Sequence, residues 1–270
     1  MTDNRIFISS ESVASKDTYD IIWSNIAFIN ALQQEFVTIE ELSQDALRSY
    51  YVDYYLAQIN NGGFAQFVYN SRWHPTMIGY VRDGLAKMGA TRHLKLFEQS
   101  AAILNRFSPQ QLESFFEGEF FGENQERDIL NAFNSAFYSL NEQEDLIVLN
   151  SRWLQTHPER IVLPQKELEV EVTRRAAAIP NREERLAQAR ADEPRYYKLV
   201  RALCAQTGQV LNDITAGSPE TYEEQNYLAW HFLTDQGHHY MIDTGTEGLM
   251  FNDASKKPIA TFPIPADFGD

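Results

Sequence analysis

The sequence predicts a mainly α-helical protein: a multi-helix N-terminal domain followed by a small α+β module with an antiparallel β-meander. Helix start signals and helical apolar periodicity dominate the chain up to about residue 190. After residue 192, short β-rich runs alternate with turn-like residues, a pattern typical of antiparallel neighbours. We therefore expect a helical domain at 1–190 and the α+β module at 191–270.

Capping and proline signals place the helices of the first domain. Helix starts are indicated by the stretches TIEE (38–41), SPQQ (108–111) and NEQE (141–144). His74-Pro75 is expected to open a helix that ends near Gly89, and Pro180 to end a helix that begins near Pro164.

The second domain begins with EPRYYKLVRALCAQTG (193–208), which predicts one helix ended by Gly208. Strands are expected at 226–234, 238–244, 248–251 and 258–264. The turn-like segments between them are short, so the strands should form a meander with the helix packed on one face.

Composition favours a folded cytoplasmic protein. Of its 270 residues, 43% are hydrophobic, which is enough for a core, and no apolar run reaches the ~18 residues of a membrane helix. The N-terminus does not have the pattern of a signal peptide. The single cysteine, Cys204, lies on an apolar helical stretch and is expected to be a buried, inert thiol.

The net charge of −15 argues against direct binding to nucleic acid or to membranes, both of which attract cationic surfaces. Two interpretations stay open. The acidic surface could attract a basic protein, or it could simply keep the protein soluble.

No motif for nucleophilic, phosphate-binding, zinc-protease or dinucleotide chemistry occurs, so we assign no catalytic residue and no cofactor. His231 and His238, in adjacent predicted strands, are weak metal-ligand candidates, with Asp235 or Asp243 as a third ligand. With Tyr240, these histidines support an alternative function: a ligand- or metal-binding protein, or an unrecognised hydrolase. Otherwise they are ordinary strand residues.

The stretch INNGGFAQFVYNS (59–71) interrupts a long apolar region. Asn60 and Asn61 can adopt left-handed backbone angles, and Gly62 and Gly63 adopt them freely. This predicts a corner between a helix at 42–59 and a following helix. Gln66 and Asn70 lie one turn apart and should bond each other or the preceding turn.

The stretch NNGGFAQFVYN resembles the NNGGFxQFxYN signature of a bacterial helical-domain family of mostly unknown function, which includes a dimeric DNA-mimic protein. The matching positions are Asn60, Asn61, Gly62, Gly63, Phe64, Gln66, Phe67, Tyr69 and Asn70. The resemblance covers about 20–150. It implies an all-helical domain, a homodimer, no known enzyme activity, and an acidic surface that imitates DNA phosphates and occupies a DNA-binding protein.

Residues 107–150 carry nine acidic side chains and one basic side chain, a net charge of −8. The candidate partner-binding surface is Glu113, Glu117, Glu119, Glu123, Glu126 and Asp128. A solvated helix face is the other interpretation. A basic stretch at 174–190 could itself bind an acidic surface. The leading hypothesis is thus a non-catalytic acidic binding protein, in its sharpest form a DNA mimic.

Overall fold

A computed structural model describes residues 4–118, 120–266 and 268. The chain forms two compact units, Met1–Arg182 and Glu183–Asp270, and we describe each by itself. The limits of 1–190 and 191–270 that we set from the sequence remain a prediction.

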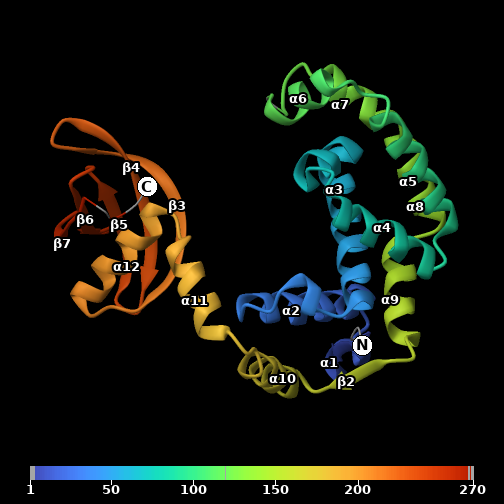
Figure 1. Ribbon diagram of the computed structural model, residues 1–270, viewed down its shortest axis with the longest axis horizontal. Coiled ribbons are helices and arrows are strands. Elements are labelled where there is room, and N and C mark those ends of the chain that lie inside the picture. The colour runs from blue at the N-terminus through green and yellow to red at the C-terminus, as the bar shows by residue number, and fades with distance from the viewer. Residues whose placement is uncertain (1–3, 119, 267, 269–270) are drawn as a thin grey trace. The chain divides into compact units, whose positions relative to one another are not determined.

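The first unit is mostly helical (Figure 1). Its α-helices are α1 (Ser10–Ala14), α2 (Tyr19–Gln34), α3 (Gln44–Ser71), α4 (Pro75–Lys87), α5 (Thr91–Leu104), α6 (Pro109–Glu117), α7 (Gln125–Leu130), α8 (Asn134–Gln143), α9 (Leu146–Thr156) and α10 (Gln165–Ala177). Short 3₁₀ turns occur at η1 (Ile39–Glu41) and η2 (Asn131–Phe133). None of the helices in the described part of the chain is long and apolar enough to cross a membrane.

Most of the expected helix starts are confirmed. The amide of Thr38 bonds Glu41 Oε2 at 2.9 Å in a capping box, although the helix it opens is only the 3₁₀ turn η1. The capping box of Ser108 opens α6, and Pro75 opens α4. The expected start at Asn141 is wrong, because Asn141 lies inside α8; Asp145 caps α9 instead.

Helix α3 forms the centre of this unit, and α2, α4 and α9 pack against it. The core around it is aromatic. Tyr55 makes edge-to-face contacts with Phe67 and Phe97, with ring centroids 5.0 and 5.4 Å apart. These three side chains are fully buried, as expected for a helix that is apolar on nearly every face.

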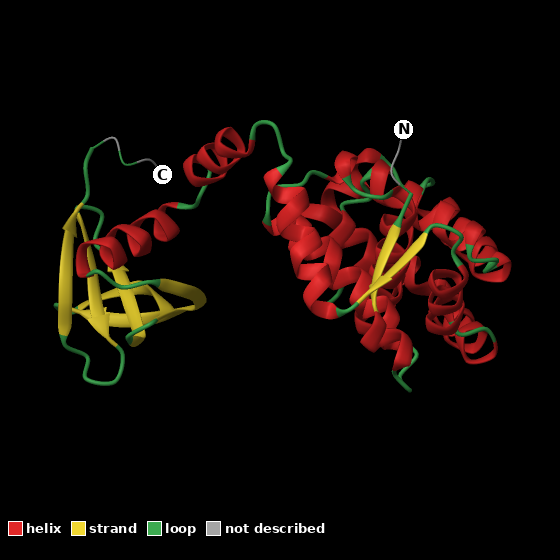
Figure 2. Cartoon of the chain, turned by 90° about the horizontal axis from the view of Figure 1, so that it is seen from below, coloured by secondary structure: helices red, strands yellow, loops and turns green. Residues whose placement is uncertain are grey.

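A two-stranded parallel sheet, which the sequence did not predict, joins the two ends of the first unit. Strand β1 (Ile6–Ser9) pairs with β2 (Arg160–Leu163), and the two lie side by side in Figure 2. All four residues of β1 are buried. A four-residue strand is too short for a periodicity signal, and its partner lies about 150 residues away in the chain.

A half-buried carboxylate on α3 yields a pH-dependent prediction. The Tyr19 hydroxyl donates to Asp53 Oδ2 at 3.2 Å. Burial raises the pKa of the Asp53 carboxyl, although this hydrogen bond opposes the rise. Burial, with the nearby charge of Asp53, also raises the pKa of Tyr19 to about 12. Ionised Asp53 therefore lowers the stability of the fold as the pH rises above the unfolded value of about 4.

Asp53→Asn keeps an acceptor for Tyr19 and removes the charge. We expect it to increase the free energy of unfolding at pH 7, on the order of 1 kcal/mol, because the neutral amide avoids the cost of desolvating a charge. The gain should vanish below about pH 4, where Asp53 is protonated in both states. Urea denaturation at both pH values measures it. A loss of stability at pH 7 would contradict the assignment.

The second unit contains α12 (Arg195–Thr207) and an antiparallel sheet whose strands lie in sequence order (Figure 1). The strands are β3 (Leu211–Tyr222), β4 (Gln225–Thr234), β5 (Gly237–Asp243), β6 (Glu247–Asn252) and β7 (Pro258–Pro263). Helix α11 (Arg182–Ala191) precedes α12 and begins at the last residue of the first unit. The predicted meander is confirmed. Strand β3 was not predicted from the sequence, because its residues are mostly polar and include Pro219. The strand also shifts its register against β4 twice.

The sheet of the second unit has a core on each face. On one face, Leu199, Leu203 and Cys204 of α12 pack against Phe232, Met241 and Met250. Burial raises the pKa of the Cys204 thiol to about 11, in line with the inert thiol expected from sequence. The opposite face carries Tyr240 stacked on Phe251, with centroids 4.9 Å apart.

Candidate functional site

The predicted corner in α3 is present, and two glycines make it. Helical backbone angles are interrupted at Gly62 (φ −158°, ψ 18°) and Gly63 (φ 83°, ψ −175°). The angles of Gly63 lie in a region that is essentially restricted to glycine. The expectation for Asn60 and Asn61 was wrong: both keep helical angles and are exposed, because the glycines alone break the helix.

The break leaves backbone amides without helical acceptors, and two distant asparagines bind them. Asn134 Oδ1 accepts from the Phe64 amide at 3.1 Å, and Asn131 Oδ1 accepts from the Ala65 amide at 2.9 Å. These side chains cap the second half of α3 as an N-cap residue would. Sequence reasoning missed both asparagines, because more than 60 residues separate them from the corner.

The other amides of the signature bond the turn before the corner. Gln66 Nε2 and Asn70 Nδ2 both donate to Gln58 Oε1, at 3.0 and 2.6 Å. Among the aromatic positions, Phe64 and Phe67 are buried, and Tyr69 contacts Phe115 of α6 with centroids 5.8 Å apart. The amides of Gln66 and Asn70 are therefore satisfied within α3, and the aromatic side chains of the signature pack in the core and against α6.

Five of the six acidic residues picked from sequence lie on or between α6 and α7. Glu113 and Glu117 are on α6, Glu126 and Asp128 are on α7, and Glu123 lies in the connection, whereas Glu119 lies outside the described residues. Asp128 pairs with Arg127 at 2.9 Å. Within the described part of the chain, no ion pair involves Glu113, Glu117, Glu123 or Glu126. We call these four carboxylates the acidic face.

Large apolar side chains are also exposed in the segment that carries the acidic face. Phe121 is 82% exposed, and Ile129 is 37% exposed. Exposed aromatic side chains among charges are typical of surfaces that contact another protein.

The basic stretch at 174–190 crosses the boundary between the two units, and three arginines of its first part pair with carboxylates of the first unit. Arg174 and Arg175 pair with Glu171 at 2.7 and 2.8 Å, and Arg182 pairs with Glu35. Hydrogen bonds from Arg174 and Arg175 outweigh burial and lower the pKa of Glu171 to about 2. These guanidinium groups therefore satisfy local carboxylates, which weakens the interpretation of this stretch as a binding site for acidic surfaces.

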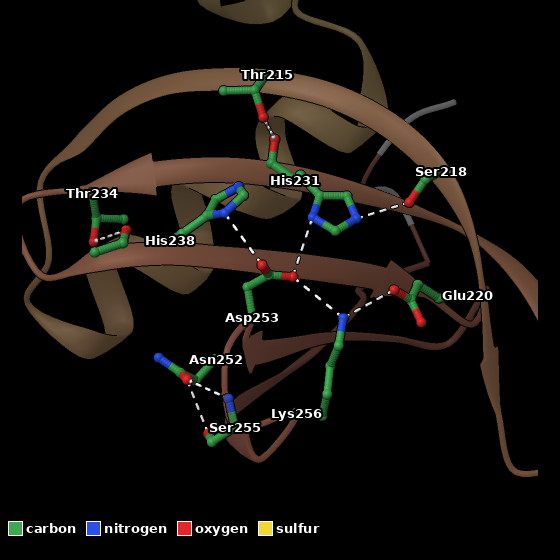
Figure 3. Close-up of polar contacts among 11 residues, drawn as sticks. Thr215, Ser218, Glu220, His231, Thr234, His238, Asn252, Asp253, Ser255 and Lys256 are labelled. Carbon is green, nitrogen blue, oxygen red and sulfur yellow. Dashed lines mark hydrogen bonds and ion pairs between the residues drawn. The ribbon is translucent and has the colours of Figure 1, made fainter.

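The second unit brings the two predicted histidines together on the sheet face opposite α12. Figure 3 shows His231 of β4 and His238 of β5 on either side of Asp253. His231 Nδ1 lies 3.5 Å from Asp253 Oδ1, and His238 Nδ1 lies 3.3 Å from Asp253 Oδ2. Lys256 Nζ lies 3.3 Å from Asp253 Oδ1 and 3.1 Å from Glu220 Oε1.

The two aspartates proposed from sequence as third ligand are engaged elsewhere. Asp243 pairs with Arg195 at 2.7 Å, and Asp235 Oδ1 accepts from the Val210 amide at 2.8 Å. Asp253 takes that place, in the turn between β6 and β7. The spacing of residues in the sequence could not indicate Asp253 as a ligand, because its turn comes close to the histidines only through the pairing of β5 with β6.

Between η1 and α9 the described elements of the first unit are α-helices and 3₁₀ turns, built around the broken helix α3 and its capping asparagines, and they include the acidic segment. Residues 40–157, from η1 to the end of α9, match the family model described as DMP19-like protein. The family resemblance of the NNGGFAQFVYN stretch is thereby confirmed over these residues, and the second unit lies outside the match. Searches among curated proteins and among solved structures gave no match.

Proposed function

We propose that the DMP19-like region is a non-catalytic binding module whose acidic face occupies the DNA-binding surface of a basic protein. The observation that carries the proposal is the acidic face itself: its carboxylates are exposed or half-exposed and form no ion pair with any described residue, and the exposed Phe121 lies two residues from Glu123. The family resemblance supports the same role, because the family includes a DNA mimic.

The physical argument rests on where the charge lies. Residues 107–150 hold −8 of the net charge of −15, although they make up about a sixth of the chain. Clustered charge of one sign speeds encounter with a partner of opposite sign and makes affinity depend on salt. Phe121 would add apolar contact area that salt does not weaken.

The experiment compares two baits in affinity capture from nuclease-treated lysate of the source cells. One is the wild-type protein, and the other carries Glu→Gln at all four positions of the acidic face. We expect the wild type to retain a DNA-binding protein that elutes as salt increases, and the variant to bind it at least tenfold more weakly.

A matched control removes the same charge elsewhere. Glu→Gln at the exposed Glu159, Glu167, Glu169 and Glu183 also changes the net charge from −15 to −11. This variant should capture the partner as the wild type does. Equal loss in both variants would mean that net charge, rather than the acidic face, drives binding. Capture of no basic protein would contradict the proposal.

The family resemblance also implies a homodimer, which we propose without assigning an interface. Light scattering coupled to size-exclusion chromatography should give twice the chain mass at micromolar concentration. A monomer mass over the same range would contradict a stable dimer. The partner would then bind the acidic face of a monomer.

A further inference from the structure

We propose that His231, His238 and Asp253 form a zinc-binding site in the second unit, separate from the acidic face. Zinc is held in proteins by imidazole nitrogen and carboxylate oxygen, and three protein ligands with a fourth open position are a common arrangement. Within the described residues, this is the group of histidine and acidic side chains close enough to share one ion.

The distances fit the geometry of zinc. With metal–ligand bonds of about 2.0–2.1 Å, two ligands of a tetrahedral site lie roughly 3.4 Å apart. The carboxylate of Asp253 lies 3.5 Å from one histidine and 3.3 Å from the other. The ligand atoms of all three side chains lie within 4.8 Å of one another. His238 is 42% exposed, so a small rotation toward the ion meets little resistance.

Hydrogen bonds hold two of the ligands in place. The Asp253 amide donates to the His238 carbonyl at 3.2 Å, so the turn that carries Asp253 is fixed to β5. Ser218 Oγ bonds His231 Nε2 at 2.8 Å, and this leaves Nδ1 directed at Asp253. Partners of this kind, which orient a histidine through its other ring nitrogen, are characteristic of metal sites.

Lys256 would compete with a bound ion for the carboxylate of Asp253. Its ammonium group bonds Asp253 and Glu220 and partly neutralises the ligand carboxylate (Figure 3). Zinc would compete with Lys256 for Asp253, while Glu220 remains available to the lysine. Removing the lysine should therefore strengthen zinc binding, whereas a purely structural His–Asp–Lys network would only lose an ion pair.

Zinc titration of the chelator-treated full-length protein tests the proposal, by calorimetry and by competition with a zinc indicator. We expect one zinc per chain with a Kd below about 10 µM, that is, tighter than roughly −7 kcal/mol. His238→Gln and Asp253→Asn should each weaken binding at least tenfold. Ser218→Ala should weaken it about tenfold through the orientation of His231. Lys256→Gln should tighten binding several-fold.

The exposed His74 of the first unit supplies the control, because His74→Gln removes an imidazole far from Asp253 in sequence and in a different unit. It should leave zinc binding unchanged. Circular dichroism of each variant verifies that the sheet is intact. Less than one zinc per chain, or binding that survives both His238→Gln and Asp253→Asn, would overturn the assignment.

Discussion

Gly63→Ala is expected to destabilise the helical unit by about 3 kcal/mol or more. The backbone of Gly63 has φ +83° with ψ −175°, and holding a side-chain residue in such a region costs about 1–3 kcal/mol. An added Cβ would also lie 2.1 Å from Asn134 Nδ2 and 2.4 Å from Asn131 Oδ1. Both asparagines must then move, and the two hydrogen bonds that cap Phe64 and Ala65 are lost at about 1 kcal/mol each.

Urea denaturation of the full-length chain, followed by circular dichroism at 222 nm, measures the effect on the helical transition. Gly79→Ala is the matched control. Gly79 lies inside α4, and nothing approaches its Cβ position within 4 Å. Alanine there should be neutral or should stabilise by up to about 1 kcal/mol. Equal stability of Gly63→Ala and the wild type would show that the corner tolerates a side chain.

Asp45→Ala should cost about 3 kcal/mol of unfolding free energy at neutral pH. Asp45 is buried at the start of α3, and three side chains converge on it. Arg48 Nη1 and Lys87 Nζ lie 2.7 and 2.9 Å from Oδ1, and His157 Nε2 lies 3.2 Å from Oδ2. Breaking a buried ion pair by removing one partner typically costs 3–5 kcal/mol, and the lower figure suits a cluster in which Lys87 is half exposed.

The loss of unfolding free energy in Asp45→Ala should depend on pH. Burial works to raise the pKa of Asp45, but hydrogen bonds and charge from Lys87 and Arg48 outweigh it and lower the pKa. A lowered folded-state pKa stabilises the fold above the unfolded value of about 4, and this contribution is lost as the pH falls through the folded-state pKa. The difference between wild type and Asp45→Ala should therefore shrink at acid pH.

Asp83→Ala is the control for this prediction. Asp83 also lies near Arg48, at 3.6 Å, but its side chain is 58% exposed. Exposed pairs contribute at most about 1 kcal/mol, so this variant should remain close to wild type. Similar losses for both aspartates, or a loss at Asp45 that does not change with pH, would contradict a buried electrostatic cluster.

The sequence predicted features that local chemistry determines. Capping boxes, the glycine break at Gly62–Gly63 and the end of α12 at Gly208 each depend on neighbouring residues. The asparagines that cap the corner, Asn131 and Asn134, could not be predicted, because tertiary folding alone brings them to α3. Strands β1 and β2 could not be predicted for the same reason, because about 150 residues of sequence separate them.

For the candidate sites, the sequence indicated some of the residues involved but not the side chains that lie next to them in the fold. His231 and His238 were placed in adjacent predicted strands, and their ring centroids lie 5.6 Å apart. Asp253 was missed because a turn, rather than the strand pattern, carries it to them. The acids of 107–150 were evident from composition, whereas the exposure of Phe121 beside them required coordinates. The functional role of that surface stays a prediction.

Competition with DNA tests the central claim most directly. Labelled duplex DNA is bound to the basic protein recovered in the capture experiment, and the wild-type protein is added while fluorescence anisotropy is followed. Occupation of the DNA-binding surface predicts that the DNA is released in full, and that the acidic-face variant needs at least a tenfold higher concentration to release it. A ternary complex, in which the DNA stays bound while the protein binds the same partner, would contradict the account.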